Sequence, residues 1–107
     1  MVSHINSQKP LTSAELSIIE NLDLNDEFMF KTIRDQICRY GEEGISETSL
    51  LNGISVVYGT GDTPSAWLIQ YIPMFNHMLR QRVDMPCHVA IFVEEGGRIY
   101  RFCHGLF

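Results

Sequence analysis

The fold is decided near the end of the chain by CHVAIFV (87–93), EEGG (94–97) and RIYRFCH (98–104). Two runs of β-branched and aromatic residues flank a Gly-Gly turn, which predicts a β-hairpin. A two-stranded hairpin is marginally stable in water at best, so it must pack at least one face on apolar partners. We therefore expect the rest of the chain to supply helices that cover it.

The register of this hairpin stays open. A three-residue loop would place Glu94 opposite Arg98 and Phe92 opposite Tyr100, whereas an even loop would change these pairs. In either register both faces keep several apolar side chains, which is typical of strands that are covered on two sides. One sheet face is therefore an expected surface for self-association, and a homodimer is the expected assembly.

Two helices are predicted before the sheet. Residues 1–10 read as a flexible lead-in to a single domain over 11–107. Thr12 with Glu15 makes a capping box, which predicts a helix from about Ser13 to Leu22. The inner side of that helix should carry Leu16, Ile18, Ile19 and Leu22.

The second helix would begin at a cap supplied by Asn25 or Asp26 and end at Gly41. With the first helix it would form a helical hairpin. Its apolar face should carry Phe28, Met29, Ile33, Ile37 and Tyr40.

Residues 45–58 allow two interpretations. Ser46 can cap a helical turn that ends at Asn52-Gly53, or Asn52-Gly53 can be the turn of a second hairpin. In both interpretations we expect Ile54–Tyr58 to be a strand, because it is rich in β-branched residues.

A long helix is predicted from Pro64, behind a Thr63 cap, to about Arg82. Pro73 falls on its outer face and would either bend the helix or split it. The predicted fold class is α+β, with a helical hairpin, this long helix and an antiparallel sheet of three or four strands that ends in the C-terminal hairpin. Two apolar rows should face the core: Trp67, Tyr71, Met74 and Met78, and Leu68, Ile72, Phe75 and Leu79.

Composition limits the classes of function. The chain has 107 residues, 45% of them hydrophobic, and a net charge of −5. Such a chain builds a core, and its acidic balance argues against binding nucleic acid through phosphates. No apolar run is long enough to cross a membrane, and residues 1–10 lack the apolar segment of a signal peptide. With three cysteines and no disulfide framework, the expected location is the cytoplasm.

One candidate site is a small-molecule pocket between the 64–82 helix and the C-terminal hairpin. Aromatic and methionine side chains at helical spacing also have a plainer interpretation, as core. The pocket candidates are Trp67, Tyr71, Phe75, Met78, His88 and Tyr100.

The doublets Cys87-His88 and Cys103-His104 raise the question of a metal site or an activated thiol. Adjacent strand residues point to opposite faces, so one face can offer at most two of these four side chains. They are therefore only weak metal candidates, and no metal or other cofactor is predicted. Packing in the interior is the alternative role for the thiols.

A third candidate site is the turn that contains Gly59, Gly61 and Thr63, which opens a helix and could bind an anion. It lacks a lysine, Asp62 would repel phosphate, and Pro64 stands where a dinucleotide-binding loop has its third glycine.

These patterns favour a small cytosolic accessory protein that acts by binding another protein chain, with no catalytic residue evident. The first alternative is a ligand-binding protein or enzyme that uses the pocket described above. The second is a winged-helix-like regulator that reads nucleic acid with Arg98 and Arg101, although the net charge argues against that partner.

Overall fold

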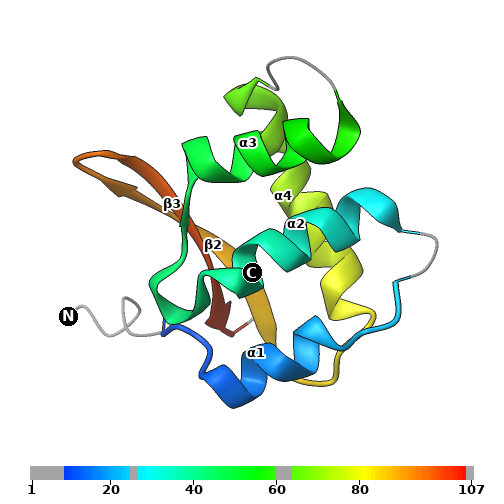
Figure 1. Ribbon diagram of the computed structural model, residues 1–107. Helices are drawn as coiled ribbons and strands as arrows, with labels where there is room; N and C mark the ends of the chain where they lie inside the picture. Colours follow the sequence, from blue (N-terminus) through cyan, green and yellow to red (C-terminus); the bar gives the residue numbers. More distant parts are fainter. Residues whose placement is uncertain (1–8, 25–26, 60–63, 106–107) are drawn as a thin grey trace.

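The computed structural model describes residues 9–24, 27–59 and 64–105 (Figure 1). It confirms the α+β class. The sheet has three antiparallel strands in the order β1-β3-β2. The strands are β1 (Ile45–Ser46), β2 (Cys87–Glu94) and β3 (Gly97–His104). The helices are α1 (Ser13–Glu20), α2 (Phe28–Arg39), α3 (Glu47–Tyr58) and α4 (Ser65–Arg80), with a short 3₁₀ turn, η2 (Gly41–Glu43).

The C-terminal hairpin is present, with an even loop. Glu94 pairs with Gly97 across a two-residue turn, so Ile91 lies opposite Tyr100 and Phe92 opposite Ile99. The register of the three-residue loop, with Glu94 opposite Arg98, is not adopted. Gly97 has φ +126°, a backbone conformation that favours glycine and explains why one stands at this turn.

This register decides which hairpin side chains enter the core. Val89, Ile91, Tyr100 and Phe102 share the face that packs on the helices, and three of them are fully buried. Phe75 of α4 stands 6.1 Å from Phe102, between ring centroids. Figure 1 shows that the turn between β2 and β3 projects beyond the helices, so the two strands are covered mainly at their other end.

Two segments pair with the side of β3 that faces away from β2. Ile45 of β1 lies opposite Tyr100. Further along, the backbone N–H of His104 donates to Lys9 and the N–H of Leu11 donates to Phe102, at 2.8 and 3.0 Å. Lys9 is thus held against β3 although it falls in the expected lead-in, of which residues 1–8 lie outside the described part of the chain.

The start of α1 follows the prediction, since both hydrogen bonds of the Thr12–Glu15 capping box are present. The helix ends at Glu20, and Asn21 donates its side-chain N–H to the Ser17 carbonyl there. The prediction for Ile18 was wrong, because its side chain is exposed.

In α2 the core side chains are Phe30, Ile33 and Ile37, which are fully buried. The prediction was wrong for Phe28 and Tyr40, whose side chains are exposed at the first residue of the helix and just after its last. The candidate caps at 25 and 26 lie outside the described residues.

The prediction of a strand over Ile54–Tyr58 was wrong, because these residues form the second half of α3. Ser46 caps this helix by accepting from the N–H of Ser49, so one of the two interpretations of residues 45–53 was partly right. Gly53 does not turn the chain: it lets α3 approach α2, where an added Cβ would stand 2.6 Å from Gln36 Cδ. Packing of α3 on α2 outweighs the β propensity of its valines.

The long helix α4 is continuous through Pro73, which is exposed as expected, and the split was not adopted. The helix ends at Arg80, and Pro64 precedes its first turn instead of starting it. The predicted Thr63 cap lies outside the described residues. Of the two apolar rows, Leu68, Ile72, Phe75 and Leu79 are buried, Trp67, Tyr71 and Met78 are partly buried, and Met74 is exposed, contrary to prediction.

Candidate functional site

On the side of β2 that faces away from β3, backbone hydrogen bonds among the described residues are made at Val89 but not at the following residues that point the same way. Asn76 of α4 receives a hydrogen bond from the N–H of Val89 at 2.7 Å and donates one to the Val89 carbonyl at 3.2 Å. Both backbone groups of Val89 therefore point away from β3, and so do those of Ile91 and Val93, because the pattern repeats every two residues. Within the described part of the chain, no hydrogen bond reaches the outward groups of Ile91 or Val93.

An apolar hollow of about 270 Å³ lies beside this open edge, between α4 and β2. The residues that line it are all apolar: Ile69, Ile72, Pro73, Val89 and Ile91. Val93 lies on the same side of β2, two residues beyond Ile91, and is 84% exposed. Unpaired backbone groups next to an apolar hollow can bind an extended chain whose side chains enter the hollow.

The hollow lies between α4 and the C-terminal hairpin, where a pocket was expected. The residues that line it, however, are not the six pocket candidates of the sequence analysis. Trp67 and Tyr71 stack on each other, with ring centroids 5.2 Å apart, and pack partly buried on the core. Met78 is also partly buried against the core, and Phe75 is fully buried in it.

The last two pocket candidates lie on opposite faces of the sheet. Tyr100 is in the core and donates its O–H to Glu47 at 2.7 Å, and desolvation together with this carboxylate raises its pKa. His88 shares the other face with Cys103, and its Nδ1 lies 2.7 Å from the Gly105 carbonyl. Because a carbonyl only accepts, Nδ1 carries the hydrogen in this contact. The six candidates therefore do not converge on one cavity.

The two Cys-His doublets are split by the strand pairing. Cys87 lies opposite His104 on one face, and His88 lies opposite Cys103 on the other. His104 Nε2 contacts Glu15 Oε1 at 3.0 Å. Over the described ranges, no group of three or more His, Cys, Asp and Glu side chains is placed to hold a metal ion.

The thiols are poorly suited to nucleophilic chemistry. Burial raises the pKa of Cys87 to about 11, with a further contribution from the Glu15 charge. Burial also raises the pKa of Cys103 to about 11 and that of Cys38 to about 12. These groups are neutral thiols at pH 7, and the thiolate is the reactive form.

The candidate anion-binding turn is described only at Gly59, because Gly61 and Thr63 lie outside the described residues. Gly59 ends α3 in a left-handed conformation, φ +65°, and its N–H donates to Ser55. Its role there is to stop a helix.

The arginines near the hairpin do not gather into one basic surface. Arg98 and Arg101 lie on opposite faces of β3, since they are three residues apart. Arg98 pairs with Glu47 at 3.4 Å, and Arg101 pairs with Glu94 at 3.9 Å while it covers the Phe92 ring. Each is matched by a carboxylate, which leaves little positive charge for a phosphate backbone.

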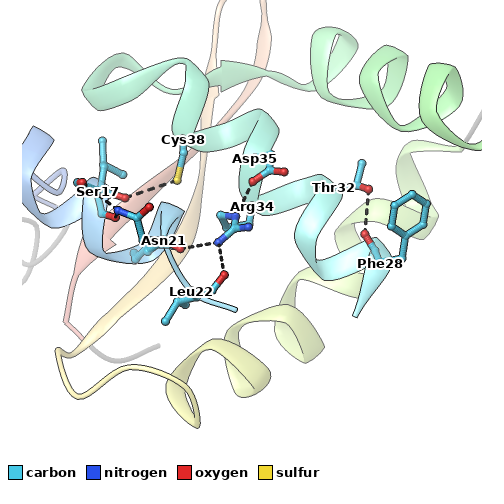
Figure 2. Close-up of polar contacts among 10 residues, drawn as sticks. Ser17, Asn21, Leu22, Phe28, Thr32, Arg34, Asp35 and Cys38 are labelled. Carbon is cyan, nitrogen blue, oxygen red and sulfur yellow. Dashed lines mark hydrogen bonds and ion pairs between the residues drawn. The ribbon is translucent and has the colours of Figure 1, made fainter. Parts of the chain in front are cut away.

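The sequence analysis did not identify two buried polar side chains, Asn76 and Arg34, as residues with a structural role. Arg34 of α2 is 2% exposed and donates to the carbonyls of Ile19 and Leu22, at 2.6 and 3.3 Å (Figure 2). It also pairs with Asp35 at 2.6 Å. Each of the two interrupts an apolar helix face in the sequence, and that interruption was the available signal.

Comparisons with protein-family models, with curated proteins and with solved structures find no match for this chain. In the described residues, no helix has both the length and the apolar character needed to cross a bilayer.

Proposed function

We propose that this protein acts by binding other protein chains, a second copy of itself first among them. The observation that carries the proposal is the edge of β2, where the outward backbone groups of Ile91 and Val93 stand next to an apolar hollow. Native proteins usually cover, charge or shorten such an edge, and this one carries exposed Val93 instead. Its three thiols are unpaired, which fits a reducing compartment such as the cytoplasm.

The test is the oligomeric state. Light scattering over a concentration series from about 1 to about 500 µM should show the mass rising above that of a monomer. Val93→Lys should abolish this rise, because a lysine on an edge strand opposes pairing. The matched control is Val56→Lys, an 81% exposed side chain on α3, the helix that follows β1 at the opposite edge of the sheet. A monomer mass at every concentration, or an equal loss in both variants, would contradict the proposal.

A second candidate function is the binding of a small apolar molecule in the hollow between α4 and β2. The hollow is lined by apolar residues, and its volume of about 270 Å³ is just under the usual range of small-molecule pockets. Cyclohexanol is a suitable probe and should raise the thermal midpoint of the protein. Ile69→Trp, which fills the hollow, should remove this rise, whereas Ile18→Trp at an exposed position of α1 should keep it.

A further inference from the structure

The edge of β2 carries a projection and a hollow on the same side of the strand. The hollow reaches Ile91, and the projection is the exposed side chain of Val93. If a second β2 pairs antiparallel so that its Val93 lies opposite Ile91, then its Ile91 lies opposite Val93 of the first copy. The same Ile91–Val93 contact therefore forms twice, once in each direction. This is the property of a surface that pairs with itself about a two-fold axis.

The backbone groups agree with this register. Ile91 and Val93 both direct their N–H and C=O outward, as argued above from the Asn76 contact. An antiparallel pair of Ile91 with the partner's Val93 exchanges both hydrogen bonds, and the symmetric pair repeats them. Phe92 directs its backbone groups toward β3, so the axis passes beside Phe92 and the partner's Phe92 at a position without hydrogen bonds.

Charge favours the antiparallel direction. The turn of the hairpin carries Glu94 and Glu95, both exposed. A parallel pair would bring the glutamates of the two copies together, which is unfavourable. In the antiparallel pair, strand pairing ends at Ala90, because Asn76 already occupies the edge at Val89. The turn of each copy then leaves the edge near Asn76 and the exposed Arg80, one helical turn further along α4 on the side of Asn76. The acidic turn of one copy thus meets a cation of the other.

We infer that the occupant of the β2 edge is a second copy of this chain. The two β2 strands pair antiparallel with Ile91 opposite the partner's Val93, and the two-fold axis passes at Phe92. The three-stranded sheets join into one sheet of six strands, β1-β3-β2-β2-β3-β1, and each Val93 fills the hollow of the other copy. The inference rests on the proposed function and adds the direction and the register of the pairing.

Cysteine cross-linking tests the register. Directly opposite residues without hydrogen bonds have Cα atoms about 4.5 Å apart, which lies within the range of a disulfide. Mild oxidation of Phe92→Cys should therefore give a disulfide-linked dimer, on the order of tenfold more than Val56→Cys gives at the same concentration. The wild-type protein, with its three buried or partly buried thiols, sets the background.

A second pair of variants covers the case in which Phe92→Cys fails to fold, since Phe92 packs under Arg101. The register places Glu94 opposite the partner's Ala90. A mixture of Glu94→Cys and Ala90→Cys proteins should form a disulfide-linked heterodimer, and neither variant alone should cross-link. No cross-link above background in either experiment would overturn the inference.

The two proposals fail in different ways. If light scattering shows dimers that Val93→Lys abolishes, but neither cross-link forms, the proposed function stands and the register is wrong. The proposed self-association itself fails if the wild-type protein is a monomer throughout the concentration series, and the inference then falls with it.

Discussion

The side-chain amide of Asn76 pairs with both backbone groups of Val89, accepting at 2.7 Å and donating at 3.2 Å. It takes the place that a neighbouring strand would occupy at this residue. The edge of β2 is therefore closed by a helix where Val89 is buried, and the closure stops before Ile91. The same contact that protects half of the edge shows which way the backbone groups of the other half point.

Replacing Asn76 with leucine should destabilise the fold by about 2–4 kcal/mol, because two buried backbone groups of Val89 lose their partners. Asn76→Asp should also be destabilising, because its carboxylate accepts from the Val89 N–H but sets an oxygen against the Val89 carbonyl and buries a charge. Urea unfolding measures both changes, and hydrogen exchange should show faster exchange of the Val89 amide. Gln70→Leu, at an exposed position of α4, is the matched control. Equal stability of the leucine variant and this control would contradict the role given to Asn76.

Arg34→Met should cost about 2–4 kcal/mol, because the carbonyls of Ile19 and Leu22 lose a charged donor in the interior (Figure 2). Arg34→Lys should recover only part of this, since an ammonium lacks the planar fork of a guanidinium. The measurement is the denaturant midpoint, with Arg39→Met on the exposed side of α2 as control. Full recovery by lysine would show that charge alone matters here.

The capping box should make stability depend on pH through Glu15. The Thr12 N–H donates to this carboxylate at 2.8 Å, and this hydrogen bond is the main reason why its pKa lies below its usual value of 4.5. The ionised group therefore stabilises the folded chain above pH 4.5, and this contribution is lost as the pH falls through the lower folded-state pKa.

The unfolding midpoint, measured from about pH 3 to about pH 7, should consequently fall less steeply toward acid in Glu15→Gln than in the wild type. Glu20→Gln, at the exposed end of α1, should keep the wild-type slope. Parallel curves for wild type and Glu15→Gln would contradict the assignment.

All three thiols should react slowly with a disulfide reagent in the native protein at pH 8. Burial raises their pKa values to about 11 or 12, so the thiolate fraction is small. Denaturation in urea should release three fast-reacting thiols. Fast reaction of Cys87 or Cys103 in the folded protein would instead support the interpretation of that thiol as a nucleophile.

Much of the fold could be predicted wherever a local interaction decides the structure. The Thr12–Glu15 capping box, the Gly-containing turn of the C-terminal hairpin and the buried row of α4 depend on neighbours in the sequence. The strand predicted over 54–58 failed for the opposite reason. Its β-branched residues favour a strand locally, but the Ser46 cap and the close contact of Gly53 with α2 make a helix there.

The candidate site could be predicted only as a region. The sequence alone determined that a helix rich in apolar residues and a hairpin apolar on both faces must share a core, because neither can remain in water. Only the tertiary structure decided the hairpin register, the burial of Arg34 and the place where Asn76 stops covering β2. Those features depend on which backbone groups find partners across long stretches of sequence, and no local pattern encodes that pairing.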